Sequence, residues 1–211
     1  MYKNRTDAGK QLALRLLHYK NEDVVVLAVP RGGLPLGKVV AKTLQAPLDV
    51  VLTKKIGHPY NKEYAIGAVS LTGHILNQTI GVSEDYIIEE IKRIRETLSH
   101  RHNQYYKNLK PQLLKNKTVI IVDDGVATGS TLLATVKLVS EREPDNIVVA
   151  IPVASKSAMD RLNESDYIHE ILCLQIPSNF RAVGQSYDDF SSVSDHQAIS
   201  ILENSNKKIA N

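Results

Sequence analysis

Two adjacent carboxylates stand beside a run of small and hydroxyl residues in the middle of the chain. Residues 118–131 read TVIIVDDGVATGST, so Asp123 and Asp124 follow an apolar run and precede a short loop. Ionised carboxylates accept hydrogen bonds only, so this pair can hold a vicinal diol or approach a metal ion. The acids alone cannot hold an anion.

The loop after the two acids has the opposite preference. It comprises Gly125, Val126, Ala127, Thr128, Gly129, Ser130 and Thr131. Free backbone N–H groups and the start of a following helix can surround a phosphate, and hydroxyls add donors. A ribose 5-phosphate satisfies both halves of the stretch. An ordinary strand-to-helix turn with solvated acids is the alternative, but the order of acids, Thr-Gly and Ser-Thr favours a ligand.

Buried strands and amphipathic helices alternate around this loop. Residues 119–122 form an unbroken β-branched run, which is typical of a strand buried on both faces. Further strands are predicted at 24–29, 48–53, 146–153 and 168–174, and helices at 5–19, 35–44, 132–139 and 155–162. We expect the first helix to begin at Thr6 or Asp7. This order predicts an α/β fold with a mostly parallel sheet and helices on both faces.

Two other strands end in residues that suit phosphate. Residues 24–29 lead into Pro30 and then Arg31, Gly32 and Gly33. Glycines allow close backbone approach, and an arginine fork matches phosphate oxygens. Residues 48–53 lead into Lys54 and Lys55. A glycine turn with a solvated arginine, and a solvated basic face, are the alternatives for these two segments.

The central stretch resembles the phosphoribosyl pyrophosphate motif of type I phosphoribosyltransferases: an apolar strand, two acids, then Ala or Asp, Thr, Gly, Gly or Ser, and Thr. A thirteen-residue match is far more specific than a bare glycine pattern. An ATP P-loop is excluded because no Gly-Lys-[Ser/Thr] occurs. PRGG at 30–33 is similar to the pyrophosphate loop of the family, and Lys54–Lys55 resembles its basic pair before a flexible loop. With the tail FRAVGQSYDDF at 180–190, the chain resembles a stand-alone bacterial group of these enzymes.

The resemblance implies a reaction and a site. The reaction is transfer of phosphoribose from 5-phosphoribosyl 1-pyrophosphate to a nitrogen acceptor such as a nucleobase, with release of pyrophosphate and with Mg²⁺ as cofactor. Asp123, Asp124 and Lys55 are the implied catalytic residues, and the two acids could also approach Mg²⁺ that the substrate holds. Substrate binding falls to Arg31, Gly32, Gly33, Lys54 and the seven residues 125–131.

Three questions about function stay open in the sequence. Phe180 and Tyr187 are candidates for a base pocket, although packing of the lobe is the favoured alternative for at least one of them. Ala127 stands where the 6-oxopurine enzymes of the family have an aspartate, so we expect hypoxanthine, guanine and xanthine to be poor acceptors. A non-catalytic sensor of the same donor is an alternative function. A phosphosugar hydrolase is a weaker one, because no nucleophile or metal-ligand cluster is visible.

The rest of the chain predicts a single domain over residues 1–211 with a small hood lobe from 56–80 and 176–193. Residues 56–64 are predicted to form a mobile loop, and 65–71 and 74–78 a hairpin. A long helix should run from Ser83 to about residue 109, with a pair between Glu89 and Arg93. Ser194 and Gln197 form a capping box for a last helix.

Composition limits the classes of partner. The net charge is only +3, so charge demands neither nucleic acid nor membrane as a partner. The lone Cys173 lies in an apolar run and indicates a buried thiol in a reducing compartment. The absence of a membrane-length apolar run or signal-peptide core makes a cytoplasmic protein the expectation. A homodimer is compatible with the sequence.

Overall fold

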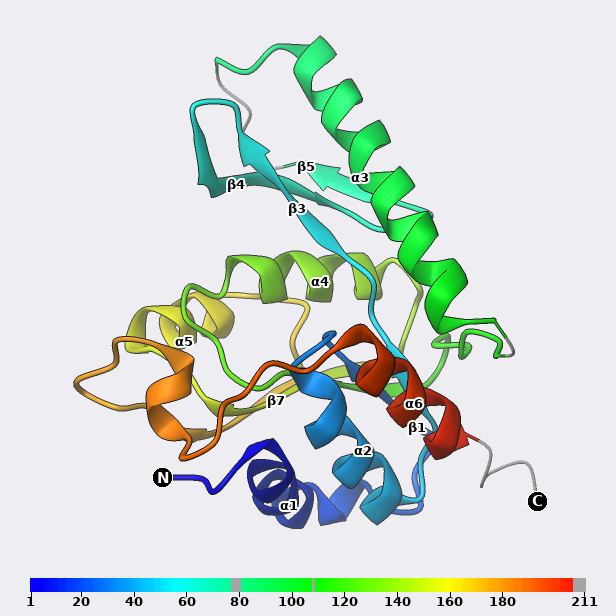
Figure 1. Cartoon of the computed structure of the whole chain (residues 1–211), viewed down its shortest axis with the longest axis vertical. Coiled ribbons are helices and arrows are strands. Elements are labelled where there is room, and N and C mark those ends of the chain that lie inside the picture. The colour runs from blue at the N-terminus through cyan, green and yellow to red at the C-terminus, as the bar shows by residue number, and fades with distance from the viewer. Residues whose placement is uncertain (77–80, 108, 207–211) are drawn as a thin grey trace.

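A five-stranded parallel sheet forms the centre of the computed structural model, which describes residues 1–76, 81–107 and 109–206 (Figure 1). Its strand order is β2-β1-β6-β7-β8. The strands are β1 (Val24–Ala28), β2 (Leu48–Val50), β6 (Thr118–Val122), β7 (Asn146–Val153) and β8 (Glu170–Gln175). In the central pair, Val24 lies opposite Thr118 and Ala28 opposite Val122. The carboxyl ends of β1 and β6 therefore meet at one edge.

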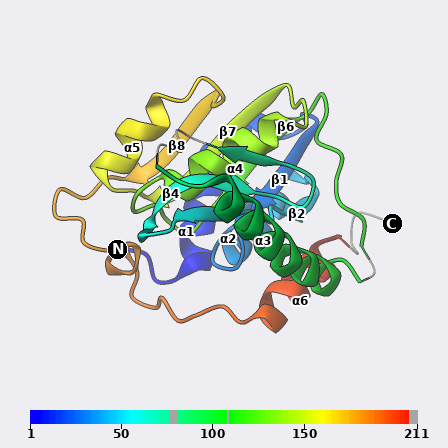
Figure 2. The same cartoon turned by 90° about the horizontal axis from the view of Figure 1, so that it is seen from above.

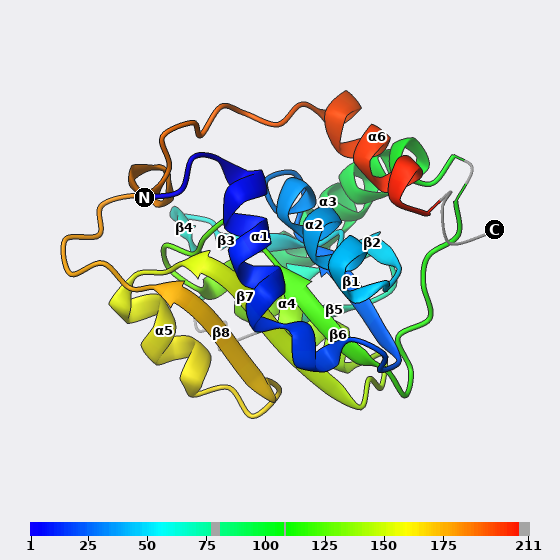
Figure 3. The ribbon, with the colours of Figure 1, turned by 90° about the horizontal axis from the view of Figure 1, so that it is seen from below.

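Helices cover both faces of this sheet, as the sequence predicts. Val26, Ile120 and Val148 share a buried cluster with the helices below, whereas Val25 and Ile121 share another with those above. The helices below are α1 (Arg5–Arg15), α2 (Gly33–Leu44) and α6 (Asp195–Asn206), and those above are α4 (Ser130–Ser140) and α5 (Lys156–Asn163) (Figures 2 and 3). Burial on both faces explains why β1 and β6 are apolar at nearly every position.

A second, antiparallel sheet lies over α4 and carries a long helix on its outer face (Figure 1). Ala68 and Ile75 of this sheet pack against Leu138 of α4. The elements are β3 (Lys54–His58), β4 (Asn61–Val69), β5 (His74–Leu76) and α3 (Glu84–Tyr105). The predicted hairpin is confirmed as far as Leu76; residues 77 and 78 of that prediction, and 77–80 of the predicted hood, lie outside the described residues.

The mobile loop predicted at 56–64 is wrong. Residues on either side of a turn in this segment belong to β3 and β4, and Lys55 lies opposite Ala68. β2 correspondingly ends at Val50 instead of residue 53. Pairing within the hairpin satisfies backbone groups that the polar, turn-rich sequence suggested were solvated. Such pairing depends on a partner strand and is not visible in local composition.

Most helix boundaries lie within two residues of the prediction, but α1 ends at Arg15 instead of residue 19. Asn4, not Thr6 or Asp7, caps α1, because its Oδ1 accepts the Asp7 N–H at 3.0 Å. Ser83 caps α3 as predicted, but the helix ends at Tyr105, before residue 109. The predicted capping box of α6 is present between Ser194 and Gln197.

One ion pair of α3 differs from the prediction. Arg93 pairs with Glu90 at 2.7 Å, one helical position nearer than the predicted Glu89. Residues three apart on a helix are neighbours as much as residues four apart, so the sequence leaves this choice open.

The tail runs back to the N-terminal residues rather than to the sheet of β3 to β5 (Figure 1). The Tyr2 N–H donates to the Ser186 carbonyl at 2.8 Å, and the Asp188 N–H donates to the Tyr2 carbonyl at 2.8 Å. Residues 176–193 thus lie in another layer from β3 to β5, although the sequence grouped both segments as hood elements.

Within the described part of the chain, no helix combines the length and apolarity needed to cross a bilayer.

Cys173 is half-buried on β8, where burial raises the pKa of its thiol. Burial of this kind suits packing rather than nucleophilic chemistry.

Candidate active site

The loops after β1 and β6 touch each other at the carboxyl edge of the sheet. A methyl group added to Gly32 would overlap the carboxylate of Asp124. One added to Gly33 would lie 2.5 Å from the carbonyl oxygen of Val122. Close approach therefore requires both glycines. A cis peptide bond joins Pro30 to Arg31 in the same loop.

The two acids form a crowded, partly buried pair. The Asp124 N–H donates to Oδ1 of Asp123 at 2.8 Å. Burial, together with the negative charge of Asp124, raises the pKa of Asp123 well above its usual range, while Arg5 opposes this rise. A cation or a set of hydroxyl donors in this position would relieve the repulsion, so the pair is suited to a ligand that brings either.

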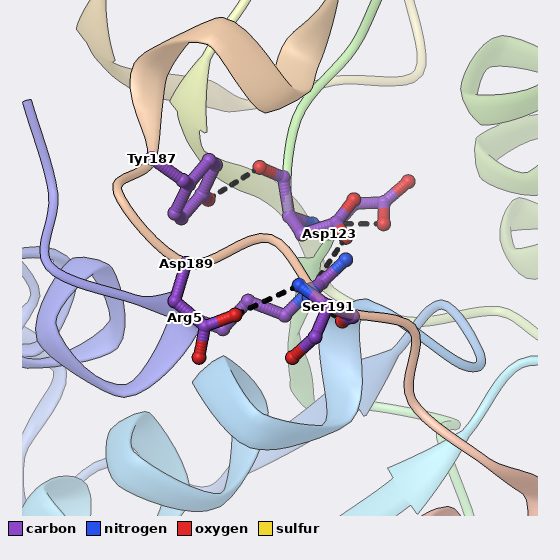
Figure 4. A network of polar contacts seen from close by, with 6 residues as sticks. Arg5, Asp123, Tyr187, Asp189 and Ser191 are labelled. Carbon is purple, nitrogen blue, oxygen red and sulfur yellow. Dashed lines mark hydrogen bonds and ion pairs between the residues drawn. The ribbon is translucent and has the colours of Figure 1, made fainter.

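Arg5, the first residue of α1, reaches into the site from the far end of the chain (Figure 4). Its Nε donates to Oδ2 of Asp124 at 2.8 Å, and its Nη1 donates to the Ser191 carbonyl at 2.7 Å. The guanidinium carbon lies 3.9 Å from the ring centroid of Phe190. Sequence reasoning missed Arg5 because its partners are 119 and 186 residues away.

Tyr187 supports the same acid from the backbone side (Figure 4). Its hydroxyl donates to the carbonyl of Asp124 at 2.6 Å. Its ring packs against Tyr2 and Phe190, at centroid distances of 5.4 and 4.9 Å, and only 5% of the residue is exposed. These contacts fit the packing alternative. Phe180 is half-buried against the core cluster, and its role in a base pocket stays a prediction.

The loop between β6 and α4 is hydrogen-bonded to β7 and to the start of α5 on one side, and it is exposed on the other side. The Val126 N–H donates to the Val153 carbonyl at 2.9 Å, and the Ser155 hydroxyl donates to the Ala127 carbonyl at 2.6 Å. Gly129 precedes α4 with a φ of 78°, which favours glycine. Ala127 and Thr128 are exposed. Their N–H groups and the start of α4 can face an anion.

Arg161 of α5 is a second basic residue that sequence reasoning missed. Its Nη1 donates to the Thr128 carbonyl and to the Ser130 hydroxyl, both at 3.3 Å. A guanidinium at this point adds positive charge beside the loop that the sequence assigns to phosphate. An arginine on the exposed face of an amphipathic helix carries no local feature that marks such a role.

The other predicted cations lie farther out. Arg31 is exposed, and its Nη1 lies 3.4 Å from Oδ2 of Asp195 in α6. Lys54 and Lys55 begin β3 instead of ending a strand of the central sheet, which corrects their predicted position. Their side chains point to opposite faces of β3. Lys54 lies on the side of α3, where Arg93, with smaller contributions from Lys62 and Lys54, lowers the pKa of Glu90. Lys55 shares the opposite face with Ala68.

The acids of the loop fit a weakly held magnesium ion. Among the residues that the structure describes, no three His, Cys, Asp or Glu side chains gather closely enough to enclose a metal. Mg²⁺ is commonly bound by one or two carboxylates plus substrate phosphates, with water completing the shell. Asp123 and Asp124 supply such carboxylates, so they fit an ion that arrives with a diphosphate.

Comparisons with known proteins place this arrangement in a family. Residues 2–190 match the model of a protein family that is described as "Phosphoribosyl transferase domain". A Mycobacterium tuberculosis H37Rv protein, provisionally named phosphoribosyl transferase Rv0571c, is 34% identical over 215 residues, which cover 100% of this chain and 48% of that protein. The chain spans about half the length of the curated relatives it matches.

Solved structures share the architecture. TT1426 from Thermus thermophilus is 37% identical with a TM-score of 0.88, over 96% of this chain and 98% of that one. AQ2163 from Aquifex aeolicus is 14% identical with a TM-score of 0.51, over 82% and 74% of the two chains, and shows the fold alone. The family match spans both loops and the tail that supports them. The chain therefore belongs to the phosphoribosyl transferase domain family.

Proposed function

We propose that this chain transfers phosphoribose from 5-phosphoribosyl 1-pyrophosphate to a nitrogen acceptor, with a nucleobase as the chemical class of the acceptor. The observation that supports this most directly is the contact between Gly32 and the carboxylate of Asp124. It joins the loop assigned to pyrophosphate with the acids assigned to ribose. A donor that carries diphosphate on C1 of the ribose needs these two groups side by side.

Different residues of the site bind different parts of the donor. Asp123 and Asp124 accept hydrogen bonds from the ribose hydroxyls, and the backbone N–H groups of residues 127–131 with the start of α4 bind the 5-phosphate. Arg31 and the N–H group of Gly32 face the pyrophosphate. Gly33 donates its own N–H to the Val29 carbonyl at 2.9 Å and contributes the close approach to Val122. Asp123 and Asp124 would also hold Mg²⁺ beside the diphosphate, where the ion supplies positive charge.

The chain's own groups act mainly on charge and orientation. The bond between C1 and the pyrophosphate oxygen breaks, the acceptor nitrogen bonds to C1, and the nitrogen releases its proton to solvent. Negative charge grows on the leaving pyrophosphate, which Arg31 and the backbone donors of its loop stabilise. Positive charge grows on the ribose ring, where Asp123 and Asp124 lie. Lys54 and Lys55 remain predicted contributors from β3.

Pyrophosphate release tests the proposal. The chain with Mg²⁺ and donor is assayed against adenine, uracil, orotate, hypoxanthine, guanine and xanthine. Donor at ~100 times its dissociation constant should also raise the free energy of unfolding by roughly 2.7 kcal/mol. Stabilisation without turnover on any base would favour the non-catalytic sensor. The absence of both stabilisation and turnover would contradict the proposal itself.

A further inference from the structure

Arg5 is built into the molecule more firmly than a surface arginine. Its side chain is 11% exposed, although it belongs to the first turn of α1. Its three contacts use different parts of the guanidinium: Nε, Nη1 and the flat face. A planar fork can satisfy an acid, a carbonyl and an aromatic ring at once, whereas a lysine ammonium cannot. The arginine is therefore fixed before any ligand arrives.

We propose that Arg5 is a positioning residue for Asp124, holding its carboxylate in the orientation that receives the ribose hydroxyls. This inference rests on the proposed function, because it assigns Arg5 a role through the acid that contacts the donor. Arg5 itself is not assigned to the donor.

Asp124 is constrained from three directions, and each constraint comes from a different segment. Arg5 binds Oδ2, the backbone of Gly32 lies against the carboxylate, and Tyr187 binds the carbonyl oxygen. Gly32 and Tyr187 limit where the residue can lie, and Arg5 adds a directed bond to the carboxylate itself. Without Arg5 the side chain could turn about its two torsions, so its orientation would no longer be set before binding.

The anchor of Arg5 argues against a side chain that swings. Phe190 and Ser191 hold the guanidinium from the tail, and the tail is itself bonded to the N-terminal residues through Tyr2. A gate would need to break these contacts as well as the pair with Asp124. The alternative is that Arg5 competes with the donor for Oδ2, in which case its removal would improve binding.

Calorimetric titration with two ligands separates these roles. Ribose 5-phosphate needs both the acids and the phosphate loop, whereas pyrophosphate needs no acid to hold a sugar. Both are titrated in metal-free buffer, in which the acids take no part in binding pyrophosphate, into the wild type, Arg5→Ala, Arg5→Lys and Arg15→Ala. Arg15 is the matched control because it is an exposed arginine at the other end of the same helix.

We expect Arg5→Ala to weaken ribose 5-phosphate roughly 10- to 100-fold, by analogy with the loss of a residue that orients a metal-binding side chain. Pyrophosphate affinity should stay within about twofold of the wild type, which would also show that the variant is folded. Arg5→Lys should lose nearly as much, because it keeps the charge but not the fork. Added guanidinium at millimolar concentration should partly restore Arg5→Ala but not Arg5→Lys.

Three results would overturn the inference. Unchanged affinity for ribose 5-phosphate in Arg5→Ala would show that Asp124 needs no positioning, and tighter binding would show competition. Equal loss of both ligands in both variants would show a role in folding alone. If the wild type does not bind ribose 5-phosphate, the proposed function fails first, so the two failures are distinguishable.

Discussion

Gly32 and Asp124 lie in direct contact although β1 and β6 deliver them from positions 92 residues apart. The missing side chain of Gly32 leaves the space that the Asp124 carboxylate fills. At the same time Gly32 precedes α2 with φ −62° and ψ −33°, which any residue can adopt. Its glycine is thus required by the neighbouring acid and not by the backbone.

Gly32→Ala should damage the site more than the fold. The added methyl group must push the Asp124 carboxylate away, so we expect affinity for ribose 5-phosphate to fall about 10-fold, or about 1.4 kcal/mol. The change at a helix N-cap should cost no more than about 1 kcal/mol of unfolding free energy. Calorimetry and urea unfolding measure the two. In an Asp124→Ala background the same change should cost no further affinity, and additive losses would contradict the contact.

Asp123→Asn should be more stable than the wild type at pH 7 but should lose phosphoribosyl transfer. Burial and the charge of Asp124 raise the pKa of Asp123, so the ionised form costs folding free energy above the ordinary carboxyl pKa. In metal-free buffer the variant should be more stable than the wild type at pH 7. The difference should close as the pH falls below the ordinary carboxyl pKa, towards about 3, where the Asp123 side chain is neutral in both the folded and the unfolded state.

Transfer should nevertheless be lost in Asp123→Asn, because the amide is a weaker acceptor for the ribose hydroxyls. Urea unfolding at several pH values and pyrophosphate release measure the two effects. A variant that is less stable at pH 7 would show that the Asp123 charge is compensated in the folded protein.

Arg161→Ala should weaken ligands that carry a phosphate in the loop before α4. The side chain bonds Thr128 and Ser130 from an exposed position, so we expect a modest loss of roughly threefold to tenfold for ribose 5-phosphate. Lys156→Ala is the control, since Lys156 is an exposed cation of the same helix that pairs with Asp160. Equal effects of the two substitutions would indicate general charge rather than contact.

Ala127 should restrict the acceptor. It is exposed at the mouth of the loop, and its methyl group neither takes nor gives a proton. General acid–base help is worth about 10²–10⁴-fold, so a 6-oxopurine that needs such help should react poorly. We expect Ala127→Asp to improve hypoxanthine relative to adenine, with Ala127→Asn as the matched control. Efficient use of any 6-oxopurine by the wild type would contradict this expectation.

Tyr2 should contribute to unfolding at alkaline pH. Burial raises its pKa to about 12, from about 10 when exposed, and its hydroxyl donates to the Pro152 carbonyl at 2.9 Å. Stability from Tyr2 is present below pH 10 and is lost as the pH rises towards 12, by up to about 3 kcal/mol. Tyr2→Phe should be less stable than the wild type at pH 8, with the gap narrowing by pH 11.5. A constant gap in urea unfolding would contradict the shift.

The central sheet and its loops were predictable because their signals are local. Residues 119–122 are apolar at each position since helices cover both faces, and the motif that follows is contiguous. The segment at 56–64 was not predictable from its polar composition, because β3 depends on pairing with β4.

The supports of the site were not predictable either. Arg5 and Arg161 bond loop atoms far away in the chain, and nothing in their own neighbourhood distinguishes them from solvated arginines. Tyr187 was singled out for its aromatic face, but its hydroxyl makes the contact with Asp124. Sequence patterns predict which loops bind the donor, whereas the residues that hold those loops are visible only in the tertiary structure.

The bonds from Arg5 have a consequence for the order of folding. They join positions 119 and 186 residues apart, so α1, the loop after β6 and the tail must all be in place together before both bonds can form. Contacts of such long range form slowly because the entropy of loop closure is lost before they contribute. During refolding, the parallel sheet should therefore gain protection from hydrogen exchange first. The capacity to bind ribose should return later, when the two distant ends of the described chain meet over Asp124.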